Sequence, residues 1–160
     1  MATVMLSKDA ISASLAECYL TIGDRRFNFM TAIKVEARFK KNKVKIPRLG
    51  VTGRGNKSVS WEGTGSCTMH YNTSIFREMM KDFKDTGKDV YFEMEITNDD
   101  PSSDAGSQTI NLLQCNIDGG TLAKFDDSSD SYLDEDTDFT FDDFDMPKKF
   151  EELIGLNLSE

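Results

Sequence analysis

One stretch of the sequence resembles a phosphate-binding loop. Residues 50 to 58 read G-V-T-G-R-G-N-K-S. In a nucleotide-binding loop, G-x-x-x-x-G-K-[ST], backbone N–H groups surround the phosphates and the lysine directly follows the last glycine. Here Asn56 separates Gly55 from Lys57, and a strand-like pattern follows where a helix should begin and face the anion. We therefore interpret this stretch as a flexible loop and expect it to bind no nucleotide.

A second stretch has the carboxylate spacing of a calcium-binding loop. Acids fill positions one, three, five, nine and twelve of the template: Asp134, Asp136, Asp138, Asp142 and Asp145. Position six is Phe139 instead of the turn-making glycine, and position twelve is an aspartate instead of a bidentate glutamate. The alternation of Phe139 with Phe141 also favours a strand. We interpret the stretch as a solvated acidic face and keep a calcium-dependent surface protein as an alternative.

The sequence offers little for catalysis. His70 is the one histidine, so a Ser/His/Asp or Cys/His scheme would have to use it, and it falls within an alternating strand pattern. We interpret it as a side chain on a polar strand face. Four aromatic residues at strand spacing form a candidate ligand platform, although such residues usually belong to the core: Trp61, Phe92, Phe139 and Phe141. We predict a protein that is not an enzyme, with no catalytic residue, cofactor or metal site.

Charge divides the chain into two opposite segments. Between Lys34 and Lys57 there are nine basic residues and one acid, a net charge of +8 within a total of −9. Residues 126–145 hold ten acids and no base. A basic segment can follow a nucleic-acid backbone or bind another anionic ligand, so a monomeric β-domain that binds an anion is a second alternative. Aromatics are sparse within this segment, where Phe39 stands alone, and the acidic remainder would repel a polyanion.

The same charge pattern favours self-assembly. A basic segment on one copy can pair with an acidic segment on the next, and such head-to-tail contacts generate rings or open stacks. The competing interpretation is that the two segments attract each other within one molecule.

Length and composition favour a single domain over residues 1–160. The chain is 38% apolar and 29% charged with 11 Phe, which predicts a packed core. No apolar run could span a bilayer, and the N-terminus lacks the features of a signal peptide, so we expect a cytoplasmic protein. The cysteines are odd in number and far apart, which predicts buried, free thiols: Cys18, Cys67 and Cys115.

Period-two alternation predicts a mainly β member of the α+β class, a sandwich or partial barrel with one main flanking helix. In the longest strand, 58–71, Val59, Trp61, Cys67 and Met69 face the core. Gly63 and Gly65 fall on that same side and indicate a bulge or a close approach. Other strands are expected over 33–40, 90–96, 109–118, 121–125 and 138–142, with a turn at Gly23-Asp24 and an exposed turn region at 98–107.

One amphipathic helix is expected after this long strand. Its apolar stripe has helical spacing: Phe76, Met79, Met80 and Phe83. Asn72, Thr73 or Ser74 can cap its start, and Gly87 can end it.

Several segments in order carry a family resemblance. They are G-T-G-S-C-T-M-H-Y at 63–71, F-R-E-M-M-K-D-F-K-D-T-G-K-D-V-Y-F at 76–92, L-L-Q-C-N-I-D at 112–118 and F-T-F-D-D-F-D-M-P-K-K-F at 139–150. The chain is similar in these segments to the XkdM-like tail tube proteins of contractile phage tails and phage-derived bacteriocins. The resemblance implies a structural subunit that forms hexameric rings, whose strands join across subunits into one barrel and whose rings stack into a tube. It also implies the tail sheath, baseplate and tail terminator as partners, and DNA as transient lumen cargo in a phage.

The resemblance also implies roles for particular segments. An extended basic loop over 41–57 would reach the neighbouring ring, through Lys41, Lys43, Lys45, Arg48, Arg54 and Lys57. Its candidate partner is the acidic segment 126–145, through Asp134, Glu135, Asp136, Asp138, Asp142 and Asp143. The small polar face of the long strand would line the lumen: Ser58, Ser60, Thr64, Ser66 and Thr68. The helix would cover the outside or a subunit junction, and the protein would assemble in the bacterial cytoplasm before entering a phage tail or bacteriocin particle.

Overall fold

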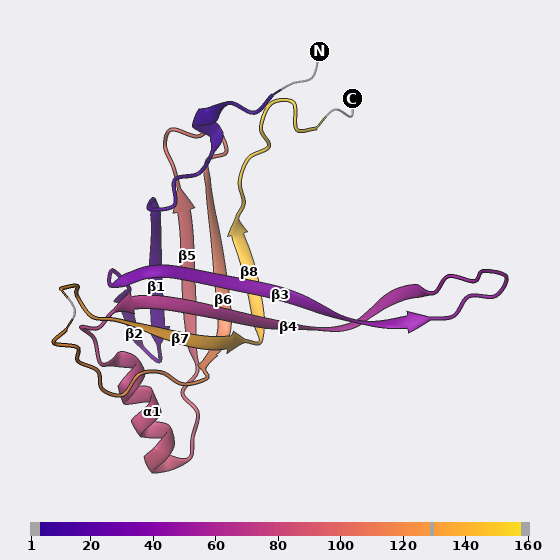
Figure 1. Ribbon diagram of the computed structural model, residues 1–160. Helices are drawn as coiled ribbons and strands as arrows, with labels where there is room; N and C mark the ends of the chain where they lie inside the picture. The colour runs from indigo at the N-terminus through magenta and orange to yellow at the C-terminus, as the bar shows by residue number, and fades with distance from the viewer. Residues whose placement is uncertain (1–3, 129, 158–160) are drawn as a thin grey trace. The chain divides into compact units, whose positions relative to one another are not determined.

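The computed structural model describes residues 4–128 and 130–157 as strands, one α-helix and one short 3-10 helix, η1 (Ser7–Asp9) (Figure 1). The predicted fold class, mainly β with one main helix, is confirmed. Hydrogen bonds link the strands in the order β2-β1-β5-β6-β7-β4-β3, and β8 pairs with β6. The described residues form two compact units, and strand β6 passes from the first to the second after Gln114. Each unit is described separately below.

The first unit contains antiparallel strands around an apolar core. Its strands are β1 (Ala16–Ile22), β2 (Arg25–Asn28), β5 (Phe92–Asp99), most of β6 (Ser107–Ile117) and β8 (Asp143–Lys148). The predicted turn at Gly23-Asp24 joins β1 to β2, and Gly23 has a left-handed φ of 59° that suits glycine. Leu20 pairs with Met94 across β1 and β5, and both side chains are fully buried. Alternation predicted β5 correctly because one face of the strand is buried.

The turn region of the first unit is less exposed than predicted. Asp100 and Ser103 are buried, although we expected 98–107 to be exposed. The carboxylate of Asp100 accepts hydrogen bonds from the backbone N–H groups of Ser12 (3.0 Å) and Ser102 (2.9 Å). The Ser103 hydroxyl donates to the backbone carbonyl of Asp9 at 3.0 Å. These polar residues are buried because the N-terminal segment covers the turn and satisfies their hydrogen bonds.

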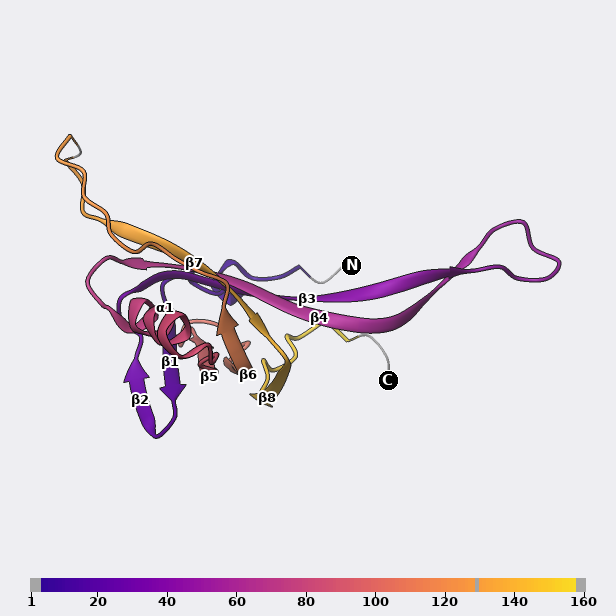
Figure 2. The same cartoon turned by 90° about the horizontal axis from the view of Figure 1, so that it is seen from below.

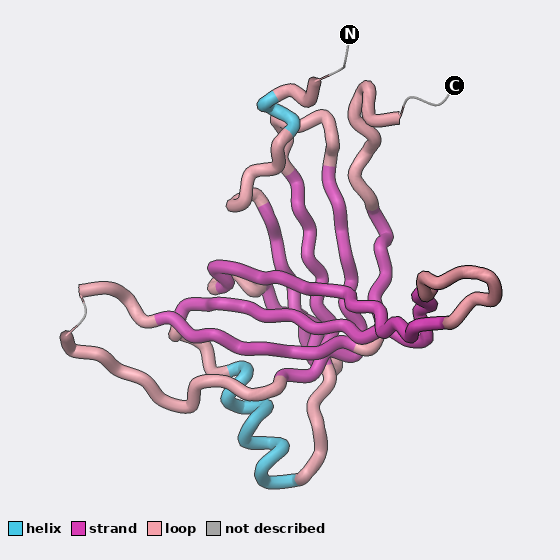
Figure 3. Tube along the Cα trace, turned by 45° about the vertical axis from the view of Figure 1, so that its right-hand side comes forward, coloured by secondary structure: helices cyan, strands magenta, loops and turns pink. Residues whose placement is uncertain are grey.

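The second unit is built on two long antiparallel strands, β3 (Ala32–Ile46) and β4 (Gly55–His70). Strand β7 (Asp134–Phe141) pairs with β4 only over Gly63–His70, and the end of β6 pairs with β7. The distal halves of β3 and β4 therefore pair only with each other among the described strands. They extend as a two-stranded ribbon with an irregular tip (Figures 1 and 3). We call residues 41–62 of this hairpin the arm, and residues 47–54 the arm tip.

Helix α1 (Ile75–Thr86) follows β4 as predicted. Ser74 occupies the N-cap position without a side-chain cap, and Gly87 ends the helix in the left-handed conformation, with its N–H donating to the carbonyl of Phe83. Phe76 and Met79 of the predicted stripe are buried, Met80 is half-buried, and Phe83 is 52% exposed. The helix therefore packs through its first half only.

Two aromatic rings explain the glycines of β4. A Cβ atom placed on Gly65 would lie 2.3 Å from Cζ of Phe139, and one placed on Gly63 would lie 2.3 Å from Cε2 of Phe141. The predicted close approach therefore comes from aromatic side chains of β7. Cys67 and Met69 are buried on the same face, as predicted. Val59 and Trp61 were predicted to pack inward, but Val59 is 62% exposed and Trp61 37% exposed, because both lie on the arm, beyond the end of β7.

Two further expectations are corrected. The strand predicted over 121–125 is irregular loop in the structure. Within the described part of the chain Cys18, Cys67 and Cys115 form no disulfide; Cys67 and Cys115 are buried as predicted, but Cys18 is only half-buried.

Candidate functional site

The arm carries the predicted basic side chains, but most of it is strand and not loop. Lys41, Lys43 and Lys45 belong to β3, and Lys57 belongs to β4. Only Arg48 and Arg54 lie on the irregular tip, so the predicted loop over 41–57 is shortened to 47–54. Regular pairing continues to Ile46 and Gly55 because a long alternating strand satisfies its backbone through its neighbour. All six basic side chains are exposed.

The arm also exposes apolar side chains. Its exposed apolar residues are Val44, Ile46, Leu49, Val51, Val59 and Trp61. Leu49, at the tip, is 104% exposed. A two-stranded ribbon has no core of its own and is marginally stable alone in water. Exposed basic and apolar side chains on such a ribbon are typical of a surface that binds a partner.

The predicted acidic surface is divided by the structure. Asp134, Asp136 and Asp138 are exposed on one face of β7, and Asp142 and Asp143 are exposed at its end. Thr68 donates a 2.6 Å hydrogen bond to Asp136, and Lys124 lies 3.6 Å from Asp134. Glu135 alternates to the opposite face and is 4% exposed, so its assignment to the acidic surface was wrong. The remaining acids lie along an extended strand, unlike the wrapped chain of a calcium loop.

Glu135 is held by Arg77 of helix α1. The two form an ion pair at 2.7 Å, with the Arg77 side chain 18% exposed and that of Glu135 2% exposed. Arg77 also donates to the backbone carbonyls of Thr73 and Thr121, and its guanidinium lies 4.4 Å from the ring centroid of Tyr71. This cluster attaches the helix to β7. The sequence does not indicate this cluster, because residues 77 and 135 lie far apart in the chain and no local pattern relates them.

The predicted lumen-facing residues lie along β4. Ser60, Thr64, Ser66 and Thr68 share one face by alternation, and this face also carries charges from the neighbouring strands. Ser58 pairs with Lys43, whereas Ser60 pairs with Asn42, so a register shift separates Ser58 from the other four. Alternation along β4 therefore does not assign Ser58 to the face that carries Ser60, Thr64, Ser66 and Thr68.

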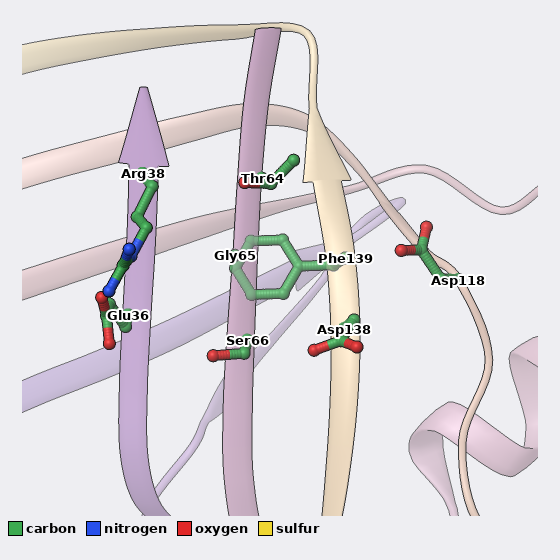
Figure 4. A pocket seen from close by; sticks show the side chains of 8 residues that line it. All are labelled: Glu36, Arg38, Thr64, Gly65, Ser66, Asp118, Asp138 and Phe139. Atoms are coloured by element: carbon green, nitrogen blue, oxygen red, sulfur yellow. The ribbon is translucent and has the colours of Figure 1, made fainter. Parts of the chain in front are cut away.

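A shallow hollow of about 390 Å³ lies on this polar face (Figure 4). Glu36 and Arg38 of β3 line it beside Thr64 and Ser66 of β4, with Asp138 contributed by β7. Arg38 donates to the Glu36 carboxylate at 2.5 Å. The face is thus a mixed polar and charged surface, on which charged side chains of β3 and β7 flank the small polar residues of β4.

The opposite face of the second unit buries the Cys67 thiol. Burial raises its pKa to about 12, and the negative charges of Asp138, Glu135 and Asp136 act in the same direction. The thiol therefore stays protonated near neutral pH, which makes it a poor nucleophile and a poor metal ligand.

His70 lies at the end of β4, beside Tyr132, with their ring centroids 4.9 Å apart. Among residues 4–128 and 130–157 no group of three or more His, Cys, Asp or Glu side chains is arranged to hold a metal ion. In the same part of the chain, no helix has the length and apolarity required to cross a membrane.

Comparison with known proteins identifies the family. The family model described as phage tail tube protein matches residues 3–148. The chain is 37% identical over 114 residues to the phage-like element PBSX protein XkdM of Bacillus subtilis (strain 168), a match that covers 71% of this chain and 77% of the relative.

Solved structures share the fold at low sequence identity. A chain from the sheath/tube terminator of the PVC extracellular contractile injection system aligns with a TM-score of 0.65 at 12% identity, over 87% of this chain and 97% of that one. A chain from the anti-feeding prophage baseplate aligns with a TM-score of 0.63 at 11% identity, over 91% and 97% of the two chains. The resemblance seen in the sequence is confirmed by the family match. The chain belongs to the phage tail tube protein family.

Proposed function

We propose that this protein builds the inner tube of a contractile phage tail or of a phage-derived bacteriocin, by forming hexameric rings that stack. The exposed arm is the observation that carries the proposal. Its ribbon is paired only within itself among the described strands, yet it presents both basic and apolar side chains to solvent. Contact with another subunit would bury the apolar groups and stabilise the ribbon. Six-fold symmetry in the related anti-feeding prophage baseplate supports the ring.

Ring closure would join the sheets of neighbouring subunits. β3 lies at one end of the strand order, so its outer edge pairs with no other strand among the described residues. Pairing that edge with the next subunit would remove an exposed row of backbone groups that otherwise invites aggregation. The polar face with Ser60, Thr64, Ser66 and Thr68 would then line a water-filled lumen.

The mechanism is mechanical and involves no bond-breaking step. Stacked rings form a stiff tube that a contractile sheath drives through a target envelope, and the lumen passes DNA in a phage or dissipates the membrane potential in a bacteriocin. Assembly would take place in the bacterial cytoplasm. The baseplate and the sheath/tube terminator named among the structural relatives support the corresponding components as partners here.

Negative-stain electron microscopy of the concentrated protein tests the proposal. We expect rings, or tubes of one uniform width, whose optical diffraction reports six-fold symmetry. The protein should be observed alone and after addition of a baseplate preparation, because tube assembly can require a baseplate as its nucleus. A protein that stays monomeric under both conditions and binds polyanions in a salt-sensitive way would contradict the proposal and support the anion-binding alternative.

A further inference from the structure

A groove on the second unit is lined by both apolar and acidic side chains. It has a volume of about 340 Å³ and lies between the C-terminal half of α1 and the segment that follows β6. Met80, Phe83, Val90 and Ile117 supply apolar walls. The charged residues that line the groove are Asp89 and Asp118.

The groove lies where the apolar stripe of α1 is no longer buried. The first turns of α1 bury Phe76 and Met79, whereas Phe83, which belongs to the same stripe, is 52% exposed and faces the groove. A large apolar side chain on the packing stripe of a helix is normally covered. An occupant that supplies apolar side chains would complete this packing.

The arm tip has the complementary chemistry. Its residues 47–54 contain no acid, and Arg48 and Arg54 flank Leu49 and Val51, which are 104% and 53% exposed. Two arginines and two exposed apolar side chains on the tip are complementary in charge and polarity to a groove lined by two carboxylates and several apolar side chains.

The tip cannot reach the groove of its own molecule. Both features belong to the second unit, so their relative positions are defined. In two perpendicular views the arm tip and helix α1 lie at opposite ends of this unit (Figures 1 and 2). The paired strands of the arm run away from the helix as far as the Ile46–Gly55 pair, so they carry the tip away from the groove (Figures 1 and 2). The occupant must therefore come from a second copy.

We propose that the arm tip of one copy docks in the groove beside Phe83 of another, with Leu49 as its apolar anchor and Arg48 and Arg54 facing Asp89 and Asp118. This inference rests on the proposed tube and names the contact that joins its subunits. The contact is heterologous, because two different surfaces meet, and can therefore propagate from copy to copy. It replaces the acidic face of β7 as the partner of the basic arm.

Site-directed crosslinking between two variants tests this contact. Thr52→Cys lies on the tip, and Lys88→Cys directly precedes the groove residue Asp89 in the sequence, so both leave Leu49 and the groove-lining residues unchanged. The two variants are purified separately, mixed under assembly conditions and treated with a short bismaleimide. We expect a covalent dimer in the mixture that is absent from either variant alone. A second mixture, of Thr52→Cys with Asp136→Cys, tests contact between the arm tip and the acidic face of β7. We expect no crosslinked dimer in this mixture.

A second variant tests the anchor itself. Adding Leu49→Asp to the Thr52→Cys variant should lower the yield of crosslinked dimer by about tenfold or more, because a buried leucine contributes an affinity factor of that order. Leu122→Asp is the control, since Leu122 is 70% exposed and does not line the groove. We expect it to leave the yield unchanged.

Electron microscopy of the same mixtures separates the two proposals. Tubes without the 52–88 crosslink, or a crosslink from Thr52→Cys to Asp136→Cys instead, would overturn the groove and leave the tube in place. Absence of both tubes and crosslink would overturn both.

Discussion

The ring of Phe139 lies against the backbone of Gly65 in the neighbouring strand, so close that a Cβ atom there would stand 2.3 Å from Cζ. Phe139 and Gly65 are register partners across β7 and β4, and Phe139 is 1% exposed. The same arrangement is repeated by Phe141 over Gly63. At Gly63 and Gly65 a side chain would therefore clash with the buried rings of Phe141 and Phe139.

Replacing Gly65 with alanine should destabilise the protein. The methyl group would force the buried Phe139 ring to move, and overpacking of this kind costs about 1–3 kcal/mol. We expect a lower urea midpoint with an unchanged denaturant slope. Gly119→Ala is the matched control, because a Cβ atom there meets nothing within 4 Å. If both variants unfold at the wild-type midpoint, the Phe139 ring does not pack against the backbone of Gly65.

Arg77→Met should destabilise the second unit strongly. The substitution leaves the Glu135 carboxylate buried without its cation, a loss of about 3–5 kcal/mol. Lys81→Met provides the comparison, because its ion pair with Asp85 is exposed and contributes about 1 kcal/mol or less. Chemical unfolding of both variants at neutral pH measures the difference. Equal, small effects would show that Glu135 is solvated in solution.

Replacing both members of the buried pair should restore part of the loss. In Arg77→Met combined with Glu135→Leu, no charge is left without a partner, and apolar replacements of similar volume are often tolerated. We expect the double variant to be more stable than Arg77→Met alone. A double variant that is less stable than either single variant would mean that the arginine matters mainly through its carbonyl contacts.

Stability should fall above pH 9 because of Cys67. The pKa of this thiol is about 12 in the folded protein and 9.0 in the reference state, so between these values the unfolded chain ionises first. The contribution of Cys67 is fully present below pH 9 and decreases by about 1.4 kcal/mol per pH unit above it.

Cys67→Ala isolates this effect from other groups that titrate at alkaline pH. Urea unfolding at pH 8 and pH 10 should show a smaller loss between the two pH values in the variant than in the wild type. The thiol should also resist alkylation in the native state at pH 8. Rapid native alkylation at Cys67 would contradict its burial.

Reversing charge on the arm should weaken assembly without unfolding the subunit. Lys43→Glu with Lys45→Glu changes four charge units on an exposed ribbon, where charges contribute little to folding. We expect the thermal midpoint to stay close to that of the wild type while the protein concentration needed for tubes rises. Lys148→Glu with Lys149→Glu is the charge-matched control. Unchanged assembly with a lower midpoint would support attraction within one molecule instead.

Local sequence pattern predicted the elements that have one buried face. β5, the second half of β7 and the first part of the α1 stripe were predicted, because alternation or helical spacing records which side chains meet a core. The turn at Gly23-Asp24 follows from the conformational freedom of glycine. The segment 121–125 was predicted as a strand from its composition, and it is loop because no neighbouring strand pairs with it in the described structure.

The acidic segment shows where composition misleads. Residues 134–138 read as one charged surface, yet Glu135 is buried while its neighbours Asp134 and Asp136 are exposed. Strand alternation separates them, and only Arg77, 58 residues away in the sequence, makes burial of Glu135 possible. No local feature records a partner at that distance.

The sequence by itself determined the class of the protein, its main helix, its opposed charges and its family, because these depend on residue order and local periodicity. Tertiary structure alone decided that the basic segment is a paired arm, that Phe139 covers Gly65, that Gln114 adopts a positive φ of 54° within β6, and that Phe83 remains exposed beside a groove. These features depend on which distant segments pack together. Packing is set by the sum of contacts across the folded chain, and no short stretch contains that sum.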